Sequence, residues 1–92
     1  MILHTVESDV IHAVGYDPEI DLLEIIYNDG RIYQYRDVPP EVYQGLMSAE
    51  SKGRYFHENI RDEFSYWQMD AETARFVRAN VQESKIRNQT SE

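Results

Sequence analysis

The sequence predicts an α+β domain: a three-stranded antiparallel β-meander packed against one main helix, with a short second helical segment and a C-terminal helix. Three observations predict this class: two apolar runs flank a turn at residues 28–30, adjacent prolines follow, and apolar residues then recur at helical spacing. Ninety-two residues make one domain. We expect residues 5–69 to form the α+β unit, residues 70–87 an appended helix and residues 88–92 a disordered tail.

The first predicted strand covers residues 8–16, which alternate weakly and contain three β-branched side chains. Gly15 within it indicates a bulge or a close approach of another backbone. Asp17, Pro18 and Glu19 follow as a predicted turn, because Asp can bond its own backbone and Pro presets φ.

Residues 22–36 form the predicted hairpin that defines the core. A three-residue loop closed by Gly30 pairs Tyr27 with Arg31 and sets Ile25 opposite Tyr33. A two-residue loop would instead divide the apolar residues between both faces, because a one-residue slip inverts a strand. We therefore favour the first register, with its tyrosine-rich face as the core face. The predicted core face carries Leu23, Ile25, Tyr27, Tyr33 and Tyr35, and the mixed face carries Leu22, Glu24, Ile26, Ile32, Gln34 and Arg36.

The predicted main helix begins at Pro40, because the first helical position needs no amide hydrogen. Apolar residues at positions 42, 43, 46, 47 and 49 share one of its faces. Gly45 costs this helix about 1 kcal/mol relative to Ala, and we expect it to allow close packing against the sheet. Gly53 stands where a C-terminal cap belongs, which predicts that the helix ends near Ser51.

The second helical segment is predicted within residues 54–67, where apolar residues at positions 56, 60, 64 and 67 form a narrow stripe typical of a core-facing helix. Asp70 is a good N-cap with Thr73 in the matching third position, so we predict that the last helix starts there. Its apolar face is thin, consisting of Ala74, Val77 and Val81, and indicates either loose docking or a surface for a partner.

The chain is acidic, with a net charge of −8, and has no cysteine, which excludes disulfides and thiolate chemistry. No apolar run approaches ~18 residues and the N-terminus lacks a basic start, so we expect a cytoplasmic protein with no membrane partner. Residues 1–30 hold seven acidic and no basic side chains, whereas residues 31–61 hold five basic and four acidic ones. This middle third either holds an anion site or exposes solvated arginines.

Little in the sequence is typical of catalysis. His4, His12 and His57 are scattered, no HExxH motif occurs, and no serine lies in a nucleophile-elbow pattern. We therefore predict no catalytic residue, no metal and no cofactor.

Two stretches carry the candidate binding residues. Tyr33 and Tyr35 would stack unpaired bases if exposed, with Arg31 or Arg36 at the phosphates, and would be core if buried, which the favoured register predicts. In the second stretch, amides near Gly53 either bind an anion or form a simple helix cap. We expect Arg54 and Arg61 about two turns apart on nearly one helix face. The candidate nucleic-acid or anion-binding residues are Arg31, Arg36, Lys52, Gly53, Arg54, Arg61, Tyr33, Tyr35 and Tyr55.

An ordered set of residues centred on Tyr33-x-Tyr35 runs through roughly residues 7–66. The set consists of Ser8, Ile11, Gly15, Tyr16, Leu23, Ile25, Tyr27, Gly30, Val38, Pro39, Val42, Tyr43, Leu46, Ala49, Ser51, Gly53, Tyr55, Phe56, Asn59, Ile60, Arg61 and Phe64. It resembles the KTSC family, a small domain named from the C-terminal extension of some lysyl-tRNA synthetases. The resemblance implies similarity to small stand-alone bacterial proteins and, through the synthetase context, RNA binding.

We therefore expect a non-enzymatic binding module whose partner is RNA, either tRNA or a single strand, or another phosphate-bearing molecule. An alternative is a protein-interaction or assembly module that uses the C-terminal helix and exposed tyrosines. A second alternative is an enzyme, which would need a cleft with a perturbed carboxylate or histidine.

Overall fold

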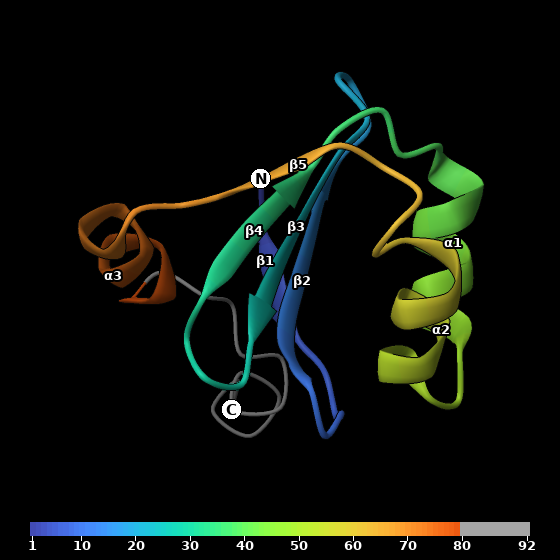
Figure 1. The fold of residues 1–92 in the computed structure, drawn as a ribbon, viewed down its shortest axis with the longest axis horizontal. Helices are drawn as coiled ribbons and strands as arrows, with labels where there is room; N and C mark the ends of the chain where they lie inside the picture. Colours follow the sequence, from blue (N-terminus) through green and yellow to red (C-terminus); the bar gives the residue numbers. More distant parts are fainter. Residues whose placement is uncertain (80–92) are drawn as a thin grey trace, which may run out of the picture.

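Five antiparallel strands form one sheet in chain order, with helices on both of its sides (Figure 1). The computed structural model describes residues 1–79. The strands are β1 (Leu3–Thr5), β2 (Ile11–Asp17), β3 (Leu22–Tyr27), β4 (Ile32–Tyr35) and β5 (Tyr66–Gln68), and the helices are α1 (Pro40–Ser48), α2 (Lys52–Asn59) and α3 (Ala71–Ala79). The predicted α+β class is confirmed. The predicted three-stranded meander is wrong in strand number, because β1 and β5 extend it at both edges.

The hairpin has the predicted register. Ile25 pairs with Tyr33 and Leu23 with Tyr35, and the Tyr27 amide donates to the Arg31 carbonyl at 2.9 Å. The loop turns at Gly30, whose φ of 95° lies where glycine is favoured.

Gly15 marks a close approach and not a bulge. It pairs with Leu3 of β1, and a Cβ on Gly15 would lie 2.9 Å from the Leu3 side chain. The register shift of β2 lies instead between Ile11 and Ala13. A side chain at position 15 would therefore require the Leu3 and Met1 side chains to shift.

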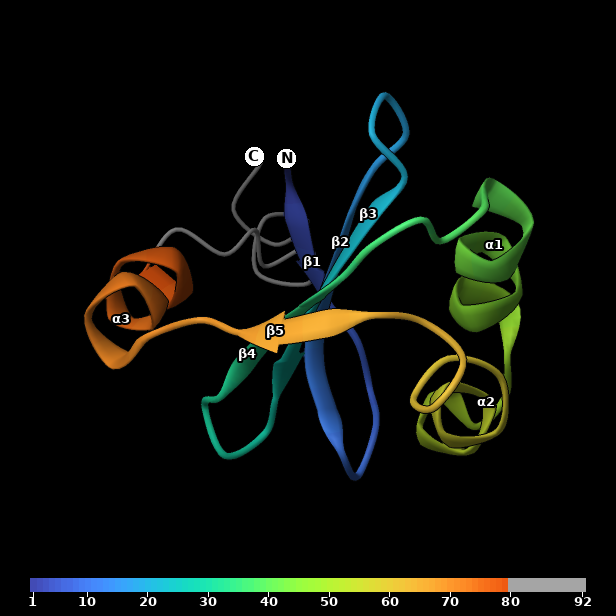
Figure 2. The same cartoon turned by 45° about the horizontal axis from the view of Figure 1, so that its top comes forward.

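Both faces of the sheet are buried. The tyrosine-rich face packs against the main helix α1, as predicted, and also against α2, whereas α3 covers the opposite face (Figure 2). On that side Ile26 and Ile32 have no exposed surface and cluster with Ala74 of α3. Glu24 lies there with 5% of its surface exposed and accepts a hydrogen bond from Gln34 at 2.8 Å. Identifying one core face was therefore correct but incomplete, because the mixed face forms a second, smaller core.

The helix boundaries correct two predictions. Helix α1 begins at Pro40 as predicted, but it ends at Ser48, before the predicted end near Ser51. Gly53 is no C-terminal cap, because it lies within the first turn of α2. The residue that caps is Ser51, whose hydroxyl oxygen accepts a hydrogen bond from the Arg54 amide at 3.3 Å. The two predicted helical segments thus exist, and the first of them ends earlier than predicted.

The prediction of helix up to residue 67 is also wrong. Helix α2 ends at Asn59, and Trp67 belongs to β5, where all three residues are exposed. Gly45 makes room for Tyr55 of α2 and not for the sheet, because a Cβ there would lie 2.6 Å from the Tyr55 ring carbon Cζ. Two helices, not a helix and a sheet, meet at this glycine.

Helix α3 starts at the predicted cap. The Asp70 carboxylate accepts the Thr73 amide at 2.9 Å, and this hydrogen bond lowers the pKa of Asp70. The predicted helix end at residue 87, the tail 88–92 and Val81 lie outside the described residues. Within residues 1–79, none of the helices has the length and apolar character needed to cross a bilayer.

Candidate functional site

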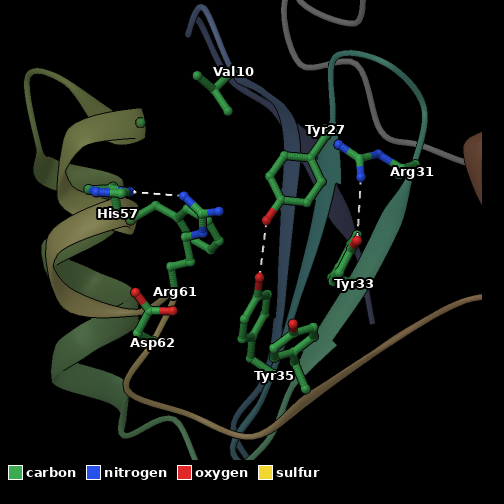
Figure 3. Close-up of a pocket in the computed structure, with 11 residues that line it drawn as sticks. Val10, Tyr27, Arg31, Tyr33, Tyr35, His57, Arg61 and Asp62 are labelled. Atoms are coloured by element: carbon green, nitrogen blue, oxygen red, sulfur yellow. Dashed lines mark hydrogen bonds between the residues drawn. The ribbon is translucent and has the colours of Figure 1, made fainter.

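A pocket of about 560 Å³ lies between the tyrosine-rich face of the sheet and α2 (Figure 3). Its aromatic wall comes from three adjacent strands, with Tyr27 on β3, Tyr33 and Tyr35 on β4, and Tyr66 on β5. Phe56 of α2 lies opposite and touches Tyr35 edge-on, with ring centroids 5.4 Å apart. Because side chains alternate along strands, pairing of β3, β4 and β5 brings these tyrosines onto one face.

The rings of the pocket form a continuous aromatic surface. Tyr33 and Tyr35 stack with centroids 6.4 Å apart, and Tyr66 lies 5.4 and 5.3 Å from them. Tyr27 meets Tyr33 edge-on at 5.3 Å. The two tyrosines of the Tyr33-x-Tyr35 signature differ in role: Tyr35 is core, with 2% exposed, whereas Tyr33 is half-buried and Tyr66 is 54% exposed. Tyr35 thus follows the interpretation of the pair as core, whereas Tyr33 lies between the buried and the exposed interpretation.

The phenol groups of Tyr27 and Tyr35 remain neutral at ordinary pH. Burial raises the pKa of Tyr35 and that of Tyr27. Their hydroxyl oxygens lie 3.0 Å apart, so one donates to the other and the pair retains one hydrogen for a further acceptor. The Tyr33 hydroxyl donates to the Gln68 side chain at 3.4 Å. The wall therefore offers hydrogen-bond donors as well as ring faces.

Arg31 lies at the edge of this wall. Its guanidinium carbon is 5.7 Å from the Tyr27 ring centroid and 5.8 Å from that of Tyr33. Its Nε donates to Asp29 Oδ2 at 2.8 Å, and hydrogen bonds from Arg31, led by that of its backbone amide, lower the pKa of Asp29. Asp29 therefore holds the guanidinium over the two rings and offsets part of its charge, and Nη1 of Arg31 donates to the Tyr33 hydroxyl at 3.4 Å.

Arg61 faces the same tyrosines from the helix side of the pocket (Figure 3). Its Nη1 lies 3.2 Å from His57 Nδ1, which accepts because a guanidinium only donates. Its charge acts against the rise in the Tyr27 pKa, which places it near that phenol. Among residues 1–79, no carboxylate lies within 4 Å of this guanidinium. The predicted shared helix face with Arg54 is wrong, because α2 ends before Arg61.

Four of the predicted site residues lie outside the pocket, namely Arg36, Lys52, Arg54 and Tyr55. Arg36 lies over the Trp67 ring, 4.9 Å from its centroid, and Tyr55 fills the space beside Gly45 between α1 and α2. Neither lines the pocket.

Lys52 and Arg54 line a second hollow at the start of α2, and Gly53 lies between the two hollows and lines both. The Arg54 amide is already bound to Ser51, and the Lys52 ammonium donates to a backbone carbonyl at 3.0 Å. Three carboxylates outnumber the two cations there, so this hollow does not favour an anion. The carboxylates are those of Glu7, Asp9 and Glu50.

Sequence reasoning missed six lining residues, namely Val10, Tyr27, Phe56, His57, Asp62 and Tyr66. Tyr66 was not identified as a pocket residue because it lies within residues 54–67, which were predicted to contain a helical segment. The spacing of four between His57 and Arg61 was a signal that helix geometry could have used. Among residues 1–79, no three His, Asp or Glu side chains are placed to hold a metal ion.

Residues 7–64 match the KTSC domain. An uncharacterized protein from Stutzerimonas stutzeri is 40% identical over 65 residues, which cover 70% of this chain and 92% of that protein. A lysine–tRNA ligase from Nostoc sp. is 40% identical over 63 residues, 68% of this chain but 11% of the ligase. The crystal structure of a KTSC domain protein from Yersinia pestis superposes with a TM-score of 0.72 at 38% identity, covering 74% of this chain and 96% of that one.

Proposed function

The chain belongs to the KTSC domain family, and from this premise we propose that it is a small non-enzymatic module that binds unpaired RNA at the tyrosine pocket. The family resemblance predicted from the ordered residues is confirmed by the match over residues 7–64. RNA enters the proposal through two supports. One is the similarity to a segment of lysine–tRNA ligases, whose name includes an RNA substrate. The other, which carries the proposal, is the pocket itself.

The pocket combines ring faces with cations. Stacking of a base on an aromatic side chain contributes about 1–3 kcal/mol per base and tolerates any sequence, because every base has a π-face. Tyr66 offers such a face, because it is 54% exposed, and it lies 5.4 Å from the half-buried ring of Tyr33. Arg31 and Arg61 stand on opposite sides of this wall, where they can contact phosphates (Figure 3). This pairing of aromatic and guanidinium groups is typical of sites for unpaired nucleotides.

The net charge of the whole chain limits how many RNA phosphates the protein can contact. A net charge of −8 repels a long polyanion, so contacts with phosphate are expected only where guanidinium groups gather. Binding should therefore be modest in affinity and sensitive to salt.

The test is fluorescence anisotropy of a short labelled single-stranded RNA and of tRNA at roughly 50 mM salt. We expect binding by the unmodified chain, weaker binding by Arg31→Ala and Arg61→Ala, and unchanged binding by Arg54→Ala. Arg54 is the matched control, because it is an exposed arginine on α2 that lies outside the pocket. No detectable binding of either RNA at this salt concentration would end the proposal.

A second candidate function is assembly with another protein. Strand β5 is an open sheet edge with all three residues exposed, and Phe76 on the neighbouring helix α3 is 71% exposed. Open edges and exposed aromatics are typical of docking surfaces. Light scattering of the unmodified chain and of a Trp67→Lys variant tests the self-association form, since a monomer in both would dismiss it.

A further inference from the structure

His57 and Arg61 form a pair on the helix side of the pocket. Helix α2 ends at Asn59, but the Arg61 amide still donates to the Phe56 carbonyl at 2.9 Å, which folds the chain back against the end of the helix. Ile60 is fully buried and anchors this turn in the core. The Arg61 side chain therefore lies beside His57, with its Nη1 3.2 Å from Nδ1, and both exposed side chains line the pocket (Figure 3).

The hydrogen bond between these two side chains requires a neutral imidazole. A guanidinium only donates, so Nδ1 of His57 accepts and the ring hydrogen lies on Nε2. Histidine is the side chain that ordinarily changes its charge between about pH 5 and 8. Once Nδ1 takes up a proton it becomes a donor as well, and two cationic donors then face each other. An anion that accepts from both of them stabilises this charged form.

The groups around His57 favour an anion at this pair. Along the chain, the charged neighbours of His57 on the helix side are Arg54, Glu58, Arg61 and Asp62. From the sheet, the charged or titratable groups that share its pocket are Tyr27, Arg31, Tyr33, Tyr35 and Tyr66. Among the described residues that line the pocket, the two arginines outnumber the one carboxylate, that of Asp62.

We infer that His57 and Arg61 together bind one phosphate of the RNA, with His57 as the imidazolium, so that binding strengthens as the pH falls. This inference rests on the proposed function. The phosphate oxygens accept from Arg61 and from Nδ1 of His57, which replaces the hydrogen bond that joins the two side chains in the free protein. The site needs no second arginine, because the two donor nitrogens are already 3.2 Å apart. Uptake of a proton is thus part of binding.

The test is the affinity for one labelled single-stranded RNA, measured by fluorescence anisotropy at fixed ionic strength from roughly pH 8 to pH 5.5. We expect the unmodified chain to bind about tenfold more tightly at the lower pH, the size expected for one added charge-assisted hydrogen bond. His57→Gln should lose this rise, because an amide keeps a hydrogen-bonding group but takes up no proton in this range. His4→Gln and Arg54→Ala are the matched controls and should keep the rise, since both residues lie outside the pocket.

Two further measurements examine the pair directly. By linkage, a tenfold gain in affinity requires that bound RNA move the titration of the His57 imidazole about one pH unit upward, which nuclear magnetic resonance detects. The titration of His4 should hardly move. At the lower pH, the losses of affinity in His57→Gln and Arg61→Ala should not add in the double variant, because both changes remove contacts to the same phosphate.

The outcomes separate this inference from the proposed function. An equal rise in the unmodified chain and in His57→Gln, or no rise in either, would overturn the role of His57 and leave RNA binding intact. A His57 titration that RNA leaves unchanged, or additive losses in the double variant, would also overturn the shared phosphate site. Absence of RNA binding at both ends of the pH range would overturn both proposals. Circular dichroism of each variant at both ends shows that the fold is kept.

Discussion

The salt dependence of RNA binding measures how many phosphate contacts the pocket makes. For single-stranded nucleic acid, the logarithm of the binding constant falls with the logarithm of salt by about 0.7 per contact. In the proposed RNA complex, Arg31 and Arg61, which both line the pocket, would provide two such contacts. From roughly 50 to 200 mM salt, the unmodified chain should therefore lose affinity about sevenfold.

Removing one arginine leaves one contact, so the loss over the same range should fall to about 2.6-fold. In the double variant Arg31→Ala, Arg61→Ala, the residual binding should hardly depend on salt. Arg54→Ala should keep the slope of the unmodified chain. Both pocket arginines are exposed, so the variants should fold normally, which thermal denaturation monitors. A slope that stays unchanged in the double variant, or that falls equally in the Arg54 variant, would show that phosphate contacts lie elsewhere on the surface.

Three further predictions concern the fold. Gly45→Ala should lower the free energy of unfolding by about 1–3 kcal/mol in urea titrations, although Ala has the better helix propensity, because its Cβ would overlap Tyr55. Adding Tyr55→Leu should restore stability. A single variant as stable as the unmodified chain would contradict this packing. Burial and a hydrogen bond to Asp21 raise the pKa of Tyr16 to about 12, so folding favours the neutral phenol. Its contribution is complete below pH 10 and is lost between about pH 10 and 12; Tyr16→Phe should flatten stability there, and parallel curves would refute this. Ile32→Ala should cost about 2–5 kcal/mol if the α3 side of the sheet is a true core, and a loss well below 1 kcal/mol in urea would refute it.

The hairpin could be predicted because its information is local. Gly30 sets the loop, and the side-chain period of two then fixes which residues oppose each other. The edge strands could not be predicted in this way, since three residues carry no readable alternation, and β5 pairs with β4 only after two intervening helices. The second core was not predicted, because Glu24 and Gln34 make that face of the hairpin mixed in polarity. In the structure these two side chains form a hydrogen bond with each other.

The candidate site residues likewise differ in whether local sequence was enough to predict them. Tyr33 and Arg31 were predicted together because they are neighbours on one hairpin, and Arg61 was predicted from its charge and from its assumed helical spacing to Arg54. Arg54 was grouped with them by assuming that one helix continued past Asn59. The sequence has no glycine or proline that would mark the end of this helix. In the structure the chain leaves α2 at Ile60, with φ −126° and ψ −47°.

The aromatic wall has a consequence for the order of folding. Strands β2, β3 and β4 are joined by short turns and can zip up as nearest neighbours, whereas β5 returns to the sheet only after two helices. Closing that long loop is the slow, entropically costly step. We therefore expect Tyr66 to be the last of the four tyrosines to reach its place in the sheet. A chain still being synthesised would form most of its sheet before the pocket could bind a ligand. A ligand that needs all four rings would in turn clamp the late strand in place, so that occupancy would report on completed folding.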